Sequence, residues 1–266
     1  RPDDFYPGML RPLAENGAIL SVPTYIVPSF ISYDPQAFDA AGLSYPQPGW
    51  TWDDFLATAV KLTQREGANV GRWGFYEIGG AVFTGRLHAG WSADAQTPPD
   101  YAEMVKILQW YEAMYVRERA AAIPAALGVA PGESISATPL ERLLKAGKAA
   151  MWDDGGANFM SGAQQAAYPQ PNQGAFFGRM SELTMSGRTQ HPDLAWRWMS
   201  YLSQHLPDER IPARRSLAEK ASFWNGLDES SKAAYRYTLD HIAPVNVRFP
   251  DEYQHYLDAV IAVAKG

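Results

Sequence analysis

Two pairs of neighbouring carboxylates are the residues in this sequence that most invite a catalytic role: Asp153 with Asp154, and Asp53 with Asp54. Glycoside hydrolysis, the reaction that such pairs suggest, needs two acids that face each other across about 5 to 9.5 Å. Neighbours on a strand point to opposite faces, so Asp153 and Asp154 are a poor acid–base pair. Asp53 and Asp54 suit the first turn of a helix, where unpaired amides and the helix dipole favour acidic side chains.

The other side chains capable of chemistry show no spacing that belongs to a known reaction. The five histidines form no H-E-x-x-H or comparable metal-binding pattern, and the lack of cysteine excludes thiol nucleophiles, disulfides and cysteine metal sites. The sequence has no glycine-rich phosphate loop, nucleophile elbow or internal repeat. His191 stands at a predicted helix start and is typical of a cap or surface group. We therefore predict no catalytic residue, no metal and no cofactor.

Aromatic residues make up 13% of the sequence, including nine tryptophans and fourteen tyrosines. Their flat apolar faces could stack on the rings of sugars. Aromatic side chains nevertheless bury so much area that they fill protein cores more often than they bind ligands. Composition alone leaves both interpretations open, and packing accounts for most of the rings.

Length and charge narrow the class of protein. The chain has 266 residues, of which 46% are hydrophobic and 20% charged, so it can bury a core as one large or two modest globular domains. The net charge is −6 and no basic run is longer than Arg214-Arg215, which makes nucleic acid an unsuitable partner. The apolar stretches are far shorter than the roughly 20 residues that span a bilayer. A cysteine-free chain is compatible with a reducing or an oxidising compartment.

The first elements that would position these side chains lie between residues 15 and 64. Ala18–Val22 is β-prone, Pro23 and Pro28 forbid a regular ladder across TYIVP (residues 24–28), and Ser29–Tyr33 resumes an extended pattern. This pattern predicts a chain that leaves one sheet and enters another. A helical turn then ends on Gly42.

Helical patterns follow along the rest of the chain. Thr51 is positioned to cap a helix over about 52–64, and residues 101–120 have apolar side chains on one face. Pro192 stands near the start of another helix, and further helices are predicted over about 229–241 and 251–266. Strands are predicted near residues 73–78 and 182–186.

The order and spacing of these segments resembles the extracellular solute-binding proteins of ABC importers, in particular the carbohydrate-binding class that includes maltodextrin-binding proteins. The matching residues are Pro23, Tyr33, Asp34, Phe38, Ala41, Gly42 and Leu43, then Trp50 to Phe55 (WTWDDF), and later Gly147 to Met151 (GKAAM) with Gly155. The segments around HPDLAW and IPARRS are also similar. Two positions depart from the family pattern: Asp34 replaces an asparagine, and Ala157 stands where maltodextrin binders have a sugar-stacking tryptophan.

The resemblance implies an α/β fold of the type II periplasmic-binding-protein-like kind, with two lobes joined by crossing strands. It places residues 1–27 in a remnant of the first lobe and the first crossing, 28–186 in the second lobe, 187–237 in the return to the first lobe, and 238–266 in a C-terminal helix of the second lobe. Arg1 would then fall well inside the family's mature sequence, so we expect an incomplete first lobe.

The resemblance also implies ligand-binding residues. Aromatic side chains would stack or pack on a sugar, and these are Tyr25, Trp91 and Tyr253. Polar side chains would bond its hydroxyl groups, and these are Glu77, Asp154, Glu182 and Arg214. Tyr76 is a further candidate by its position. Alternatives stay open for three of them, because Trp91 could pack under a loop, Glu77 could be solvated and Arg214 could form an ion pair between the lobes.

The function that the resemblance implies is extracytoplasmic binding of a small polar solute, most simply a sugar or oligosaccharide, by hinge closure and delivery to an ABC permease. We expect a monomer, either periplasmic or a cell-surface lipoprotein. Three alternatives remain: a binding-lobe module of a sensor, a truncated fragment that binds nothing, and a carbohydrate-active enzyme. The enzyme would require two carboxylates facing one cleft.

Overall fold

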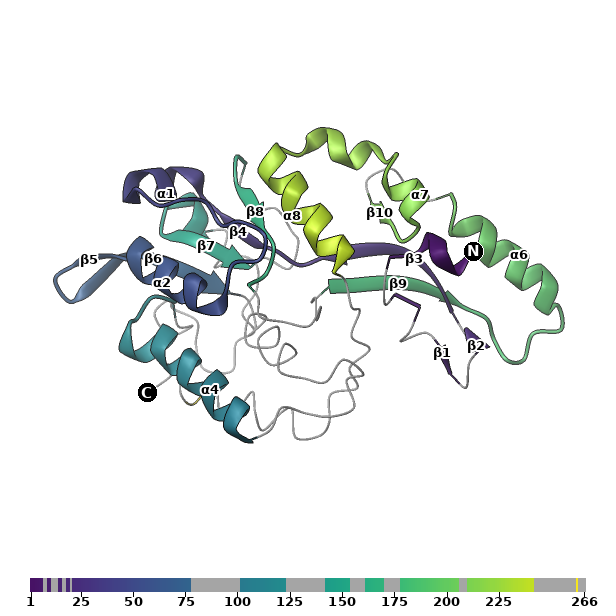
Figure 1. The fold of residues 1–266 in the computed structure, drawn as a ribbon, viewed down its shortest axis with the longest axis horizontal. Helices are drawn as coiled ribbons and strands as arrows, with labels where there is room; N and C mark the ends of the chain where they lie inside the picture. The colour runs from purple at the N-terminus through teal and green to yellow at the C-terminus, as the bar shows by residue number, and fades with distance from the viewer. Residues whose placement is uncertain are drawn as a thin grey trace. The chain divides into compact units, whose positions relative to one another are not determined.

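A computed structural model describes residues 1–6, 9–10, 14–15, 18–19, 21–77, 101–122, 142–153, 161–169, 178–205, 210–241 and 262 (Figure 1). The chain divides into two compact units. Unit 1 comprises Arg1–Ser29 and Gly174–Asn246, and unit 2 comprises Phe30–Gln173 and Val247–Gly266. In the described part of the chain, no helix combines the length and the apolar character needed to span a bilayer.

Unit 1 is built on a three-stranded antiparallel sheet in the order β10-β3-β9. Its long central pair is β3 (Ser21–Pro28) with β9 (Gly178–Thr184), and β10 (Ile211–Pro212) is added on the other side of β3. A separate small hairpin joins β1 (Ala14–Glu15) to β2 (Ala18–Ile19). β9 covers most of the strand predicted at residues 182–186 but begins four residues earlier.

Pro23 and Pro28 do not interrupt the strand as the sequence predicted. β3 runs without a break from Ser21 to Pro28, and a register shift beside Pro23 leaves Thr24 without a directly opposite residue on β9, as in a β-bulge. β10 pairs with Tyr25 and Ile26 and does not extend to Pro23 or Pro28. A proline nitrogen that faces β10 therefore costs the sheet no hydrogen bond. The expectation that the prolines forbid a regular ladder over residues 24–28 was wrong, because Tyr25 to Pro28 pair in regular antiparallel register with β9 and the register shifts only between Pro23 and Tyr25. The expectation that the strand ends before Pro23 was wrong.

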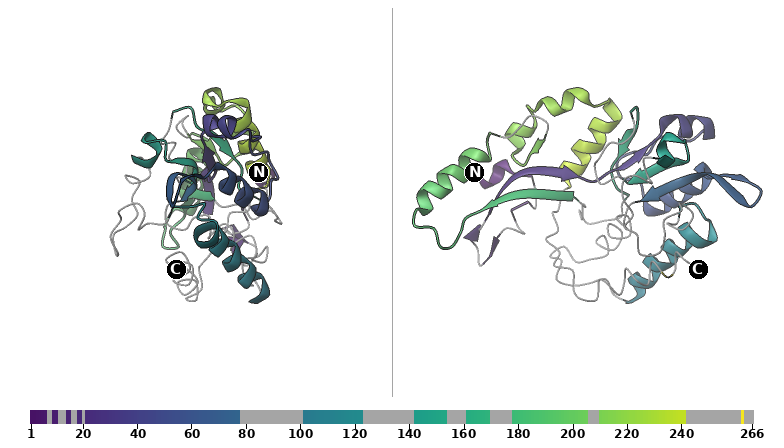
Figure 2. Two further views of the ribbon diagram at one scale, coloured as in Figure 1. Left: turned by 90° about the vertical axis from the view of Figure 1, so that its left-hand side faces the viewer. Right: turned by 180° about the vertical axis from the view of Figure 1, so that it is seen from behind.

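The helices of unit 1 lie along one side of the β3–β9 pair, and the view from behind agrees (Figures 1 and 2). They are η1 (Pro2–Asp4), α6 (Pro192–Leu202), α7 (Arg215–Ala218), η5 (Ser222–Gly226) and α8 (Glu229–Asp240). Both α6 and α8 contact β3. The Asp228 side chain caps α8 by accepting a hydrogen bond from the Ser231 amide at 3.0 Å. The predicted helices after Pro192 and over 229–241 are confirmed.

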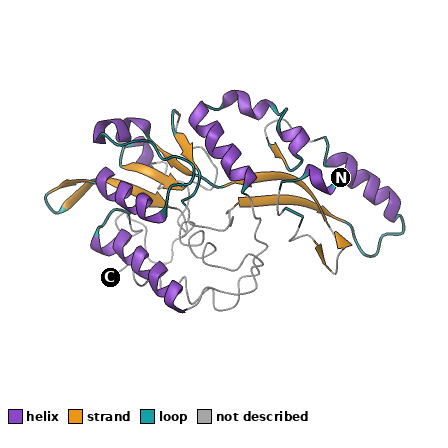
Figure 3. Cartoon of the chain, viewed as in Figure 1, coloured by secondary structure: helices purple, strands orange, loops and turns teal. Residues whose placement is uncertain are grey.

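Unit 2 contains a mixed five-stranded sheet in the order β5-β6-β7-β4-β8, drawn in orange in Figure 3. The strands are β4 (Ile31–Tyr33), β5 (Gln64–Glu66), β6 (Asn69–Glu77), β7 (Ala149–Asp153) and β8 (Gln164–Ala166). β6 and β7 are parallel, whereas the other neighbours are antiparallel.

In unit 2, the first two helices each begin at a side-chain cap. Asp34 caps α1 (Pro35–Ala41), which ends on Gly42 in the left-handed conformation, with φ of 64°. Thr51 and Asp54 form a reciprocal capping box at the start of α2 (Trp52–Leu62). The third helix, α4 (Tyr101–Glu112), continues into a π-helical turn, η3 (Ala113–Arg117). The predicted helix over 251–266 lies almost entirely outside the described residues.

Aromatic side chains form much of the core of unit 2. Phe55 of α2 contacts Phe75 of β6 edge-to-face at 4.9 Å and stacks on Trp110 of α4 at 5.9 Å between ring centroids. The Trp110 indole N–H donates to the Trp52 carbonyl at 3.0 Å. These rings bear out the packing interpretation of the aromatic content.

Candidate functional site

Half of the predicted ligand-binding residues cannot be placed. Trp91, Asp154 and Tyr253 lie outside the described residues, and of Glu77 only the backbone, at the end of β6, is described. The other four predicted residues are Tyr25, Tyr76, Glu182 and Arg214, and they lie in three different surroundings.

Tyr25 and Glu182 lie on neighbouring strands of unit 1 but on opposite faces of the sheet. Tyr25 is paired directly with Ser181, and directly paired residues share a face. Glu182 is the next residue along β9, so its side chain projects from the other face. One side of the Tyr25 ring is occupied by Arg210, whose guanidinium carbon lies 4.2 Å from the ring centroid.

Tyr76 is part of the core of unit 2. Its side chain is 1% exposed and belongs to a buried cluster with Ala122, Leu144, Ala149 and Trp152. Tyr76 is paired with Trp152 across the parallel strands β6 and β7. In the described part of the chain its ring therefore serves packing, and a direct contact with a ligand stays a prediction.

Arg214 is held inside unit 1 by groups from two distant segments. Its Nη1 lies 3.3 Å from Asp4 Oδ2, and its Nε and Nη2 donate to Ser203 Oγ at 3.3 and 3.1 Å. The guanidinium carbon also lies 4.6 Å from the centroid of the Phe5 ring. The guanidinium is thus engaged in an ion pair, although this ion pair joins two segments of one unit.

Asp4 also accepts a hydrogen bond from one amide in the first turn of α7. Its Oδ1 accepts a hydrogen bond from the Ser216 amide at 3.1 Å. Burial acts to raise the pKa of this carboxyl. The hydrogen bonds from Ser216, together with the hydrogen bond and the positive charge of Arg214, outweigh burial and lower the pKa below its usual range. Asp4 is therefore a carboxylate that the fold keeps charged.

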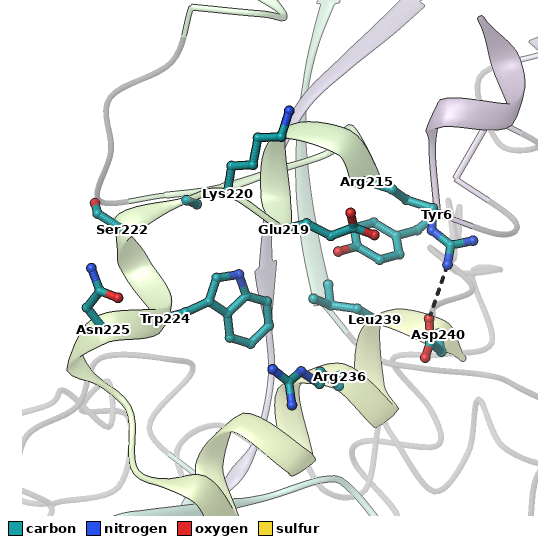
Figure 4. A pocket seen from close by; sticks show the side chains of 11 residues that line it. Tyr6, Arg215, Glu219, Lys220, Ser222, Trp224, Asn225, Arg236, Leu239 and Asp240 are labelled. Carbon is teal, nitrogen blue, oxygen red and sulfur yellow. Dashed lines mark ion pairs between the residues drawn. The ribbon is translucent and has the colours of Figure 1, made fainter.

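A cavity of about 550 Å³ lies within unit 1, between α7, η5 and α8 (Figure 4). Buried Tyr6 and Leu239 contribute apolar surface, and Trp224 projects into the same space. Charged and polar side chains complete the lining: Arg215, Glu219, Lys220, Ser222, Asn225, Arg236 and Asp240. This size falls within the range of roughly 300 to 1,000 Å³ that is usual for small-molecule sites.

Trp224 is fixed in this cavity by contacts around its ring. Its indole N–H donates to the Ala218 carbonyl at 2.6 Å, and Phe223 and Tyr235 meet it at ring centroid distances of 5.3 and 6.2 Å. Arg236 lies over the ring, with its guanidinium carbon 5.7 Å from the centroid. The indole is thus a positioned aromatic surface.

The charges around the cavity are nearly balanced. Arg215 and Asp240 form an ion pair at 3.8 Å, the dashed line in Figure 4. Burial raises the pKa of Tyr6 to about 12. The charges of Asp240 and Glu219 act in the same direction, and that of Arg215 acts against it. The Tyr6 hydroxyl is therefore neutral at physiological pH. Glu219, Lys220 and Arg236 are the other charged groups in the lining. In the described residues, no three His, Asp or Glu side chains are grouped so as to hold a metal ion.

Sequence reasoning did not single out Trp224 or Arg236. The only local signal is the aromatic pair in SFWNG, which follows a short helix and contains no periodic pattern. The cavity arises because α8 folds back beside η5, and nothing in either segment alone specifies this contact.

Comparison with models of protein families shows which family the chain belongs to. The family model described as bacterial extracellular solute-binding protein matches residues 1–205. The chain belongs to this family. A comparison with curated protein sequences gave no significant match.

Solved structures similar to this solute-binding protein share its fold. An ABC substrate-binding protein from Listeria monocytogenes, in complex with cycloalternan, is 16% identical with a TM-score of 0.65, and the alignment covers 100% of this chain and 73% of that one. A sugar transporter from Rhizobium etli is 19% identical with a TM-score of 0.70 and coverages of 100% and 77%. The sugar-binding protein MalE from Xanthomonas citri is 16% identical with a TM-score of 0.68 and coverages of 100% and 69%.

The family and the fold confirm two predictions. This solute-binding protein has the α/β fold of the type II periplasmic binding proteins, as the family resemblance implied. Its family binds solutes and does not transform them, in agreement with the prediction that the chain is not an enzyme.

Proposed function

We propose that this solute-binding protein captures a sugar between its two units and delivers it to the permease of an ABC importer. The observation that carries the proposal is the family match over residues 1–205. A sugar is the favoured solute because proteins of the same fold include a cycloalternan complex, a sugar transporter and a sugar-binding protein. The extracellular description of the family supports an extracytoplasmic protein, which we propose to be either periplasmic or a cell-surface lipoprotein and to act as a monomer.

Each unit would serve as one lobe. In this proposal unit 1 is the first lobe and unit 2 the second, with boundaries predicted near residues 27, 186 and 237. The observed division falls after residues 29, 173 and 246. A sugar that contacts both lobes gains its full set of contacts only in the closed state, so binding shifts the population toward that state.

Tyr25 would be the sugar-stacking residue on unit 1. Because Arg210 covers one side of its ring, a sugar would stack on the other. Ser181 shares a face of the sheet with Tyr25 and could bond a hydroxyl group beside it. Trp91 and Tyr253, which lie outside the described residues, would add aromatic contacts. Glu77, Asp154, Glu182 and Arg214 stay predicted polar contacts, although Glu182 projects from the face of the sheet opposite Tyr25. Tyr76 stays a candidate by its position.

Isothermal titration calorimetry with glucose, mannitol, maltose, maltotriose and cycloalternan tests this function. We expect saturable heat with at least one sugar. Tyr25→Ala should weaken that binding by about two- to thirteen-fold, since an aromatic contact contributes about 0.5–1.5 kcal/mol. Tyr201→Ala is the matched control, because Tyr201 is a half-exposed tyrosine on α6 of the same unit. Absence of heat with every sugar, from protein shown to be folded by circular dichroism, would refute the proposal.

A further inference from the structure

We propose that the cavity around Trp224 is a second binding site, for a neutral sugar ring, which unit 1 forms by itself. All the residues that line it belong to unit 1. A ligand there needs no contact from unit 2, so this site goes beyond the binding by closure proposed above.

The aromatic surface of Trp224 is the first feature that fits a sugar. The C–H face of a sugar ring packs on a flat aromatic face. The hydrogen bond from the indole N–H to Ala218 fixes the plane of the ring, and the edge contacts of Phe223 and Tyr235 support it. Such a platform is already ordered before a ligand arrives, which lowers the entropic cost of binding.

The polar side chains around Trp224 are the second feature. Glu219 accepts hydrogen bonds, Lys220 and Arg236 donate them, and Ser222 and Asn225 do both. In the part of the chain that the structure describes, the side chains of Glu219 and Lys220 have neither an ion pair nor a hydrogen bond. Glu219 is therefore available to a ligand beside Tyr6, whereas the Lys220 side chain points away from Trp224 (Figure 4).

The mixture of donors and acceptors selects the class of ligand. Each sugar hydroxyl both donates and accepts, so it can use Glu219 as well as Arg236. A carboxylate or phosphate can only accept, so it could use Arg236 but would leave Glu219 without a donor and be repelled by its charge. We infer that a neutral sugar is preferred to its acidic counterpart.

NMR of the indole N–H groups tests the site in the whole chain. The protein has nine tryptophans, and Trp224→Phe identifies the Trp224 signal by its disappearance. We expect glucose or maltose to shift the Trp224 signal saturably. Glu219→Gln should weaken this binding about ten-fold, because it replaces a charged acceptor by a neutral one. Glu229→Gln is the control, since Glu229 is paired with Lys232 at 2.7 Å and does not line the cavity.

The outcomes separate the two proposals. If sugars give calorimetric binding while the Trp224 signal does not move, the second site is refuted and the binding by closure stands. If the Trp224 signal shifts but Tyr25→Ala leaves every binding event unchanged, the second site stands and Tyr25 has no part in binding. If glucuronate shifts the signal at the same concentrations as glucose, the preference for a neutral sugar is wrong. If Glu219→Gln has no effect beyond that of Glu229→Gln, the assigned rim is wrong.

Discussion

The guanidinium of Arg214 lies 3.3 Å from the carboxylate of Asp4, and this contact joins the first residues of the chain to the start of α7. Arg214 occupies the N-cap position of α7 but makes no capping hydrogen bond with its side chain. Asp4 supplies the missing acceptor by bonding the Ser216 amide. Arg214 thus holds in place the group that caps its own helix, which gives it a structural role apart from any ligand.

Asp4→Asn should make unfolding less dependent on pH. Because the pKa of Asp4 is lower in the folded chain than in the unfolded chain, the carboxylate stabilises the fold above its unfolded pKa of about 3.9, and this contribution is lost as the pH falls through the folded pKa. We expect the variant to be less stable than the wild type at pH 7 and the difference to shrink below about pH 4. Urea unfolding followed by circular dichroism between pH 3 and 7 measures this difference in the free energy of unfolding.

Asp3→Asn is the control for this effect, since Asp3 is exposed and makes no ion pair or hydrogen bond with its side chain in the described part of the chain. Equal stabilities of Asp4→Asn and wild type at pH 7 would show that the contact with Arg214 contributes nothing to the fold.

Gly74→Ala should destabilise unit 2. A Cβ atom at position 74 would lie 1.8 Å from the carbonyl oxygen of Ala59, so α2 and β6 would have to separate. We expect a loss of at least about 1–3 kcal/mol in the free energy of unfolding, the usual cost of overpacking. Gly71→Ala on the same strand is the matched control, because the nearest of the neighbouring atoms would lie 3.8 Å from its Cβ. Similar urea midpoints for the two variants would contradict the close approach.

Thr51→Ala should weaken the start of α2. Thr51 Oγ1 accepts from the Asp54 amide at 3.0 Å, and Asp54 Oδ2 accepts from the Thr51 amide at 2.9 Å. Loss of an N-cap hydroxyl costs about 1 kcal/mol. Thr51→Ser keeps the hydroxyl and should keep most of the stability. Thermal unfolding compares the three proteins, and an equal decrease in Tm for both variants would argue against the capping role.

Features that depend on neighbouring residues could be predicted from the sequence. The Thr51 cap, the Gly42 helix end and the Pro192 helix start each involve residues within one turn, and the structure confirms them. The continuity of β3 through Pro23 could not be predicted, because it depends on where β9 and β10 pair with it.

Contacts between distant residues were beyond the reach of local patterns. Asp4 and Arg214 are 210 positions apart, and no spacing rule links them. The same holds for the cavity around Trp224, where Tyr6 meets residues of α7 and α8. The family resemblance named Arg214 but could not reveal which groups its guanidinium contacts.

Closure of the two units around a sugar is tested most directly by energy transfer between two dyes, one in each unit. The chain has no cysteine, so Gln36→Cys on α1 and Arg197→Cys on α6, both exposed positions, allow specific labelling. We predict that the transfer efficiency changes as the sugar identified by calorimetry is added, with a midpoint at the calorimetric Kd. A pair within unit 2, Gln36→Cys with Lys61→Cys, should show no change. Saturation with that sugar without any change between the units would contradict binding by closure.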